Sequence, residues 1–276
     1  MPLALVMSSF VAASRIGGAA QQYVLAQHKI DPVLAPTVLF GRSPAKGAQG
    51  EVTQPDVFRR MLGDIEADAL FGMVDLVITG HFSLAEQVEI AAGVLERVRA
   101  GAERQPVVVV DPIMGDEPKG LYVKPEVAAA VAARLVPLAD WITPNVWELS
   151  HLAGRPVGSA DEAAAAARAL GARALVTSVP AGPDRIGLLL VDGPQATLFT
   201  HPRLERAPNG TGDLVAASFG ASLVEGLPPA DAAERASRAA AETVKAGSDW
   251  RAPELPIVAL GDRLVRPTAE VRIERL

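Results

Sequence analysis

Four consecutive valines, Val107 to Val110, limit more than any other segment what this chain can fold into. Valine is β-branched and favours strands, and an unbroken apolar run is typical of a parallel strand that is covered on both faces. Strand-like and helix-like segments alternate before and after this run. This alternation predicts an α/β fold: a three-layer α/β/α sandwich around a mostly parallel central sheet.

The alternation continues through the chain without an internal repeat or a long linker, so we expect a single domain over residues 1–276. The expected strands cover 3–9, 33–38, 74–79, 107–111, a short segment ending near 143, 174–177, 187–191 and 197–200. The expected helices cover a stretch ending at 28, then 55–71, 84–100, 125–135, 146–153, 160–170, 213–225 and 229–246. The strands 187–191 and 197–200 should pair antiparallel with Asp192 and Gly193 in the turn. The tail 253–276 should add a helix and a terminal strand.

Composition excludes several classes of protein. Of the 276 residues 49% are hydrophobic, which is enough for one large core, and the net charge of −6 argues against a nucleic-acid-binding protein. Without cysteine there is no disulfide, thiolate metal site or cysteine nucleophile, which suits the reducing cytoplasm. The apolar start lacks a leading positive charge and predicts a buried strand rather than a signal peptide. No apolar run approaches the roughly 18 residues of a membrane span.

The segment Gly210-Thr211-Gly212-Asp213 precedes a helix of small residues. Glycines allow a sharp turn and a close approach to a ligand, and the free N–H groups of a first helical turn favour a phosphate or an oxyanion. A carboxylate beside them can accept a proton from a hydroxyl group. Asp213 could equally be an ordinary N-cap of the helix, so the segment alone leaves both interpretations open.

Polar residues also follow three expected strands, and ligands of parallel sheets bind at the carboxyl ends of strands. The first two groups are Asp111 after the valines and Thr143-Pro144-Asn145-x-x-Glu148 after the next strand; the third is Thr177-Ser178. Their oxygen atoms suit a hydrated Mg²⁺ ion, although each group alone would fit a turn, a helix cap or a polar loop. Ser9 and Thr37, which end the first two strands, could hydrogen-bond a small polar ring.

The loop 112–122, which contains Lys119 and Gly120, is suited either to cover a site or to form a passive surface loop. The four histidines show no metal-binding spacing. No Walker loop or GxGxxG motif is present. The GxSxG motif of serine hydrolases is also missing, so the sequence gives no support to hydrolase chemistry.

In this order, DPxMG at 111–115, TPNxxE at 143–148, TS at 177–178 and GTGD at 210–213 resemble the ribokinase-like superfamily, and within it most closely the pyridoxal kinases. The likeness covers nearly the whole chain. It implies ATP-dependent phosphorylation of the 5′-hydroxyl of pyridoxal, pyridoxine or pyridoxamine in B6 salvage.

The resemblance also implies residue roles. Asp213 would be the base, and Gly210, Thr211 and Gly212 would form the anion hole. ATP would contact Asp111, Thr143, Asn145, Glu148, Thr177, Ser178, Leu204 and Thr211. The vitamer would contact Ser9, Thr37, His81, Tyr122 and Asp213, and Tyr122 with Asp116 would belong to a lid. Mg²⁺ would bind at Asp111 and Glu148. Family members commonly use a monovalent cation such as K⁺ and form homodimers.

Two positions depart from the family pattern on the vitamer side: Phe10 replaces a polar or basic residue, and His81 replaces a tyrosine. Two alternatives therefore stay open. One is a hydroxymethylpyrimidine or other small-alcohol kinase of the same fold, although the former usually carries cysteine where Asp213 stands. The other is a non-catalytic protein that binds B6 vitamers.

Overall fold

The computed structural model describes residues 1–102, 104–204 and 208–276. Its main sheet has the strand order β12-β11-β10-β9-β8-β5-β4-β1-β2-β3. Neighbours from β2 to β9 in this order run parallel, whereas β3 and the strands from β10 to β12 are antiparallel to their neighbours. The strands are β1 (Leu3–Val11), β2 (Asp31–Phe40), β3 (Glu51–Val52), β4 (Val74–Thr79), β5 (Val107–Val110), β8 (Trp141–Ile142), β9 (Ala174–Pro180), β10 (Arg185–Asp192), β11 (Gln195–Pro202) and β12 (Arg272–Arg275).

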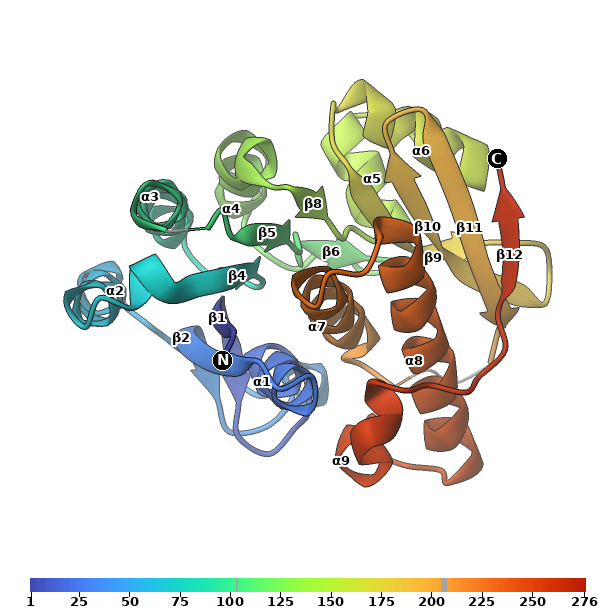
Figure 1. Cartoon of the computed structure of the whole chain (residues 1–276), viewed down its shortest axis with the longest axis horizontal. Helices are drawn as coiled ribbons and strands as arrows, with labels where there is room; N and C mark the ends of the chain where they lie inside the picture. The colour runs from blue at the N-terminus through green and yellow to red at the C-terminus, as the bar shows by residue number, and fades with distance from the viewer. Residues whose placement is uncertain (103, 205–207) are drawn as a thin grey trace.

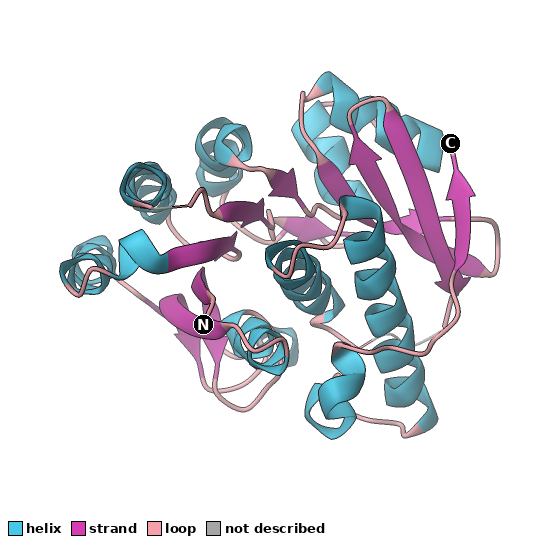
Figure 2. Ribbon diagram, viewed as in Figure 1, coloured by secondary structure: helices cyan, strands magenta, loops and turns pink. Residues whose placement is uncertain are grey.

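Helices cover both faces of this sheet, which confirms the predicted α/β/α sandwich (Figures 1 and 2). One face carries α2 (Pro55–Ala67), α3 (Ala85–Gly101), α4 (Pro125–Ala130), α5 (Val146–Ala153) and α6 (Ala160–Ala169). The other carries α1 (Gly18–Gln27), α7 (Thr211–Val224), α8 (Pro229–Asp249) and α9 (Ile257–Leu260). The valine strand explains why both layers form: Val108 and Val110 pack into the first core, and Val109 packs into the second.

The position of β1 determines where a ligand can bind. β1 pairs with β2 on one side and with β4 on the other. The chain therefore adds β2 on one side of β1 and then crosses over to add β4 and β5 on the other side. In open parallel sheets such a reversal of strand order opens a crevice at the carboxyl ends of the strands. The residues that follow β1, β4, β5 and β8 therefore face a common space.

Helix α7 begins two residues earlier than predicted. Gly210 is its N-cap, with a φ of 99° that favours glycine, and Thr211 is the first helical residue. Asp213 is consequently the third residue of the helix. The alternative that Asp213 is an ordinary N-cap is wrong.

Strand β9 also differs from the prediction, because it continues past Thr177 and Ser178 to Pro180. Its pairing with β10 shifts register at this point, and Ser178 has a φ of 61°. Two smaller differences concern turns. The segment 131–135 continues α4 as a π-helical turn, and the β10–β11 turn consists of Gly193 and Pro194 because Asp192 still pairs with Gln195.

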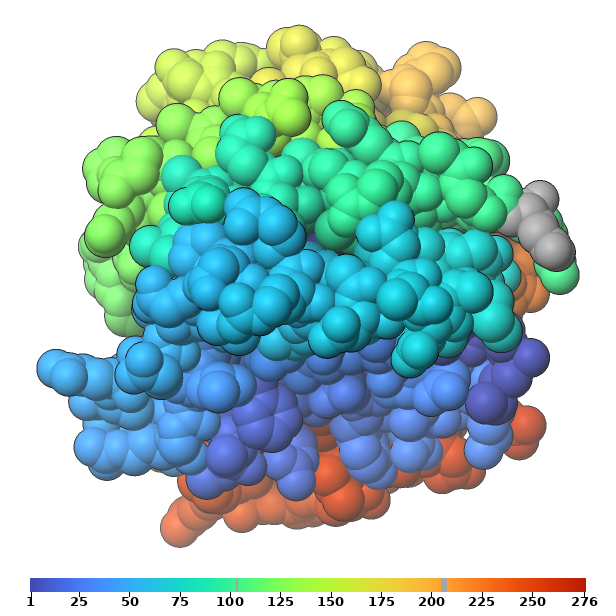
Figure 3. Space-filling view, turned by 90° about the vertical axis from the view of Figure 1, so that its left-hand side faces the viewer, coloured from blue at the N-terminus to red at the C-terminus, as the bar shows by residue number. Residues whose placement is uncertain are grey.

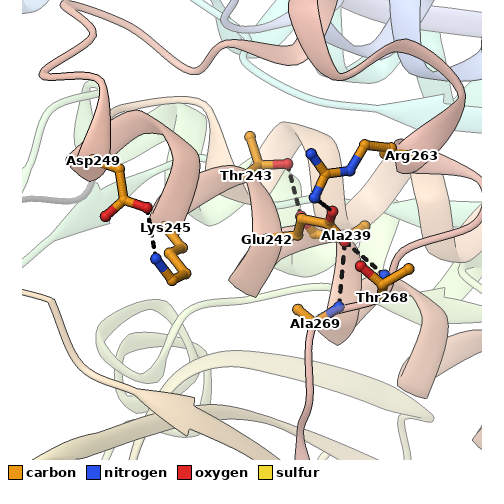
Figure 4. A network of polar contacts seen from close by, with 8 residues as sticks. All are labelled: Ala239, Glu242, Thr243, Lys245, Asp249, Arg263, Thr268 and Ala269. Atoms are coloured by element: carbon orange, nitrogen blue, oxygen red, sulfur yellow. Dashed lines mark hydrogen bonds and ion pairs between the residues drawn. The ribbon is translucent and has the colours of Figure 1, made fainter.

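The tail contains the predicted helix and terminal strand, and side chains of α8 hold it in place (Figure 4). Glu242 accepts hydrogen bonds from the backbone N–H groups of Thr268 and Ala269 at 2.6 and 3.3 Å and forms an ion pair with Arg263. Helix α9 contacts α1, and Figure 3 shows the red C-terminal segment below the blue N-terminal one, whereas the last strand, β12, lies at the edge of the sheet away from β1. None of the described helices has the length and apolar character needed to cross a membrane.

Candidate active site

A cavity of about 770 Å³ lies at the carboxyl ends of the parallel strands. It brings together residues that are up to 204 positions apart in sequence, as the pair Ser9 and Asp213 illustrates. The predicted site residues that line it are Ser9, His81, Asp111, Asp116, Tyr122, Thr143, Asn145, Glu148, Thr177, Gly210, Gly212 and Asp213. The predicted strand-end residues Ser9, Asp111, Thr143 and Thr177 thus share one cavity.

The two carboxylate oxygens of Asp213 differ in their hydrogen bonding. Its Oδ2 accepts a hydrogen bond of 2.8 Å from the backbone N–H of Gly17, while its buried Oδ1 has no partner among the described residues. Burial raises the pKa of Asp213 to about 6, although the Gly17 hydrogen bond opposes this rise. The side chain is therefore mostly ionised at neutral pH and can accept a proton at Oδ1.

The amide groups next to Asp213 suit an anion. No described residue accepts a hydrogen bond from the backbone N–H groups of Thr211, Gly212 and Asp213. A methyl group at Gly210 would lie 2.7 Å from the carbonyl oxygen of Arg15, whereas one at Gly212 would meet no protein atom within 4 Å. Gly210 is therefore required by the fold, while Gly212 leaves space that a ligand can use.

Asn145 and Glu148 form a capping box at the start of α5. The Asn145 side chain accepts a hydrogen bond from the Glu148 N–H at 2.8 Å, and Glu148 Oε2 accepts one from the Asn145 N–H at 2.9 Å. Glu148 Oε1 accepts a further hydrogen bond from the N–H of Met114 at 2.8 Å. Burial raises the pKa of Glu148 to about 7, although the hydrogen bonds from the N–H groups of Asn145, Met114 and Gly115 oppose this rise. The predicted cap is confirmed, and it fixes the carboxylate at the cavity wall.

Asp111 is surrounded by other acidic groups. Burial raises its pKa well above the ordinary value, the charges of Glu148 and Asp213 raise it further, and the Thr143 hydroxyl lowers it. A cation entering the cavity would relieve this repulsion. Within 1–102, 104–204 and 208–276 no three His, Asp or Glu side chains could hold a metal by themselves. Mg²⁺ however needs only one or two carboxylates beside water and substrate phosphate, so Asp111 and Glu148 fit it.

His81 also lines the cavity. Burial lowers the pKa of His81 to about 4, although a hydrogen bond with the Ile113 backbone opposes this shift, so its imidazole is neutral at neutral pH. Its Nε2 lies 3.2 Å from the Ser83 hydroxyl. Ile113 has a φ of 39°, which is strained for a β-branched residue and typical of functional sites.

Four predicted contact residues do not line the cavity. Thr37 lies inside β2, not at its end, and its hydroxyl donates a hydrogen bond of 2.6 Å to the His81 carbonyl, so it supports His81 and does not face the cavity. Ser178 is exposed beyond the cavity, and Leu204 packs against the core under α7 and α8. The Thr211 hydroxyl bonds to the Pro208 carbonyl at 3.2 Å, which leaves only its N–H for an anion.

Among the lining residues that sequence reasoning did not assign to the site are Gly17, Lys119 and Asn209. A methyl group at Gly17 would lie 2.3 Å from the Ser9 hydroxyl, and its φ is 59°. The Gly17-Gly18 pair directly after the first strand was the signal that could have identified this position. Lys119 was visible only as part of a possible covering loop.

Comparisons with known proteins agree with this geometry. A model of the phosphomethylpyrimidine kinase family matches residues 24–257. The chain is 35% identical over 240 residues to a pyridoxine/pyridoxal/pyridoxamine kinase of Bordetella avium, covering 84% of this chain and 81% of the relative. It is 31% identical over 281 residues to a pyridoxal kinase of Rubrobacter xylanophilus, covering 99% and 97%.

The structure of pyridoxal kinase from Leishmania donovani in complex with ADP and pyridoxine is also similar. It has a TM-score of 0.91 and 25% identity over 99% of each chain. The chain therefore belongs to the phosphomethylpyrimidine kinase family, and its predicted resemblance to the pyridoxal kinases is confirmed.

Proposed function

We propose that this protein transfers the γ-phosphate of ATP to the 5′-hydroxyl of a B6 vitamer: pyridoxal, pyridoxine or pyridoxamine. One observation carries the proposal: the unpartnered Oδ1 of Asp213 lies in the cavity next to three backbone N–H groups that no described residue uses. A proton acceptor beside an anion site is the arrangement that phosphoryl transfer to an alcohol requires. The names of the relatives, which act on B6 vitamers, supply the substrate class.

In the proposed reaction the 5′-oxygen attacks the γ-phosphorus while the bond to the β,γ-bridging oxygen breaks, and ADP leaves. Asp213 Oδ1 accepts the hydroxyl proton, and the Gly17 N–H keeps the carboxylate in place through Oδ2. The N–H groups of Thr211, Gly212 and Asp213 stabilise the charge on the transferring group. Mg²⁺, which Asp111 and Glu148 would hold, supplies neutralisation of the phosphate charge when bound.

The remaining contacts are divided between the two substrates. Ser9, His81 and Tyr122 contact the vitamer, and Thr37 supports His81 from behind. Asp111, Thr143, Asn145, Glu148 and Thr177 contact the phosphates of ATP, and Ser178 with Leu204 lies farther along the nucleotide. These assignments follow from the family resemblance together with the position of each residue relative to the cavity.

Four finer expectations belong to the same proposal. One continuous sheet from Leu3 to Arg275 supports a single kinase domain over 1–276. A monovalent cation and a homodimer follow from the family resemblance, and a cytoplasmic location is the expectation from the cysteine-free sequence.

A panel of alcohols tests the substrate. ADP release with Mg–ATP should be measured for pyridoxal, pyridoxine, pyridoxamine, hydroxymethylpyrimidine and ribose, with 5-deoxypyridoxal as a control that lacks the acceptor hydroxyl. We expect the highest kcat/KM for a B6 vitamer and no stimulation by the control. A higher kcat/KM for hydroxymethylpyrimidine, whose kinase gives the matched family its name, would reassign the substrate. Pyridoxal binding without ADP release would identify a non-catalytic binding protein.

A further inference from the structure

The short hairpin of β6 (Gly115–Asp116) and β7 (Gly120–Leu121) is fixed at its base by α5. Asn145 Nδ2 donates a hydrogen bond of 2.9 Å to the Gly115 carbonyl, and Glu148 Oε1 accepts one from the Met114 N–H. The Tyr122 N–H closes the hairpin by bonding to the Met114 carbonyl at 3.0 Å. The capping box of α5 therefore also holds this hairpin.

Trp147, in the same helical turn, packs directly against the hairpin. A methyl group at Gly115 would lie 2.1 Å from the Trp147 ring, and one at Gly120 would lie 4.0 Å from it. The ring itself stacks on His151, with 5.5 Å between the centroids. The base of the hairpin thus has little freedom to move relative to α5.

Lys119 lies in the turn of this hairpin and lines the cavity. It is the only lysine or arginine among the described residues that do so, whereas four acids line the same space: Asp111, Asp116, Glu148 and Asp213. Its side chain forms no ion pair with any other described residue. A single cation in an acidic cavity, without a partner of its own, is suited to meet an anionic ligand.

We propose that Lys119 binds the phosphate chain of the nucleotide, and that the first turn of α5 positions it through the β6–β7 hairpin. This inference deepens the proposed function and rests on it. The helix α7 offers N–H groups to the phosphates, and the acidic side chains that line the cavity repel them. Lys119 supplies a positive charge from the hairpin side, and Asn145, Trp147 and Glu148 act as positioning residues.

Replacing the charge tests the first half of the proposal. Lys119→Met should raise the KM for ATP, and the Kd for ADP measured by calorimetry, by about 10- to 100-fold, since a charge-assisted hydrogen bond is lost. The KM for pyridoxal should stay unchanged, and Lys119→Arg should retain most of the affinity. Lys124→Met is the matched control, because Lys124 is exposed, follows the same hairpin and does not line the cavity. It should behave as the unmodified protein.

A double variant tests the second half. Trp147→Leu removes the packing surface under Gly115 and should raise the Kd for ADP in the same direction as Lys119→Met. If Trp147 acts through Lys119, the double variant Trp147→Leu with Lys119→Met should bind ADP no more weakly than Lys119→Met alone. Full additivity of the two effects would overturn the positioning role.

Failure of this inference can be told from failure of the proposed function. If the unmodified protein phosphorylates a B6 vitamer and Lys119→Met binds ADP normally, the role of Lys119 is wrong and the function stands. An effect of Lys119→Met on the KM for pyridoxal, with normal ADP binding, would equally overturn it. If the unmodified protein releases no ADP with any vitamer, the proposed function fails, while calorimetry with ADP still decides the role of Lys119.

Discussion

Asp213 and Glu242 are both buried carboxylates, 9% and 6% exposed, yet their surroundings differ. Both oxygens of Glu242 have a neighbour of opposite polarity: Oε2 accepts hydrogen bonds from the N–H groups of Thr268 and Ala269, and Oε1 forms an ion pair with Arg263 (Figure 4). Asp213 accepts a single N–H at one oxygen, and its other oxygen has no partner among the residues that the structure describes. A buried carboxylate oxygen without a partner costs free energy, and a ligand that donates a hydrogen bond to it can offset this cost. Burial alone therefore does not distinguish the two acids, whereas their partners and the position of Asp213 in the cavity do.

The largest effect is expected for Asp213→Asn, which tests whether Asp213, unlike Glu242, acts in catalysis. Loss of a positioned general base typically lowers kcat by about 10²- to 10⁴-fold, while ADP binding should persist. Steady-state kinetics and calorimetry measure the two effects. Near-normal turnover would show that Asp213 is not the base.

The same variant should be more stable than the unmodified protein. Because the folded-state pKa of about 6 lies above the ordinary 3.8, Asp213 contributes stability below pH 3.8 that is lost as the pH rises through about 6. The shift of about two pKa units corresponds to on the order of 3 kcal/mol. Asparagine does not ionise, so thermal unfolding at pH 8 should show a higher Tm for Asp213→Asn, and no gain at pH 3.5.

Glu242→Ala should lower the stability of the protein and leave its turnover unchanged. It leaves two backbone N–H groups and Arg263 without their acceptor, which should cost on the order of 2 to 4 kcal/mol in the free energy of unfolding. Urea denaturation measures this loss. The kcat of the folded fraction should not change, because Glu242 is not among the residues that line the cavity. A stable but inactive Glu242→Ala would contradict the structural role of this carboxylate.

Gly212→Ala sharpens the contrast at the anion site. The added methyl group meets no protein atom within 4 Å, so the fold should tolerate it, but it would occupy space next to the free N–H groups. We expect kcat/KM for ATP to fall by about 10- to 100-fold, since small misplacements of a reacting group are costly. Gly63→Ala is the control, because it adds a methyl in equally open space on α2, away from the cavity. Equal activity of both variants would show that no ligand approaches Gly212.

The smallest expected effect concerns pH. Asp213 must be ionised to accept a proton, and its pKa is about 6 in the free protein. The kcat/KM for the vitamer should therefore fall by about tenfold per pH unit below pH 6. A pH–rate profile measures this dependence, with circular dichroism to verify that the protein stays folded. A flat profile down to pH 5 would be inconsistent with an ionising base of this pKa.

The sequence predicted the layers and much of the site because both depend on local patterns. The alternation of apolar segments determines the order of strands and helices, and strand ends such as Asp111 and Thr143 necessarily meet at one edge of a parallel sheet. Thr37 and Ser178 were misplaced for a different reason. The direction of a strand side chain depends on where the strand ends and on its register, and pairing with distant strands determines both.

The hydrogen bond from Gly17 to Asp213 could likewise not be predicted from local sequence patterns. It joins residues 196 positions apart, and only the packing of α1 beside α7 brings them together. The same holds for the hairpin that carries Lys119, whose position depends on contacts with α5.

The central claim is that Asp213 Oδ1 receives the proton of the acceptor hydroxyl. A crystal structure with a non-hydrolysable ATP analogue and pyridoxal tests it most directly. We expect the 5′-oxygen about 2.6 to 3.2 Å from Asp213 Oδ1, with the terminal phosphate against the N–H groups of Thr211, Gly212 and Asp213. A 5′-hydroxyl directed away from Asp213, or an Oδ1 that bonds to the protein in the complex, would contradict this account.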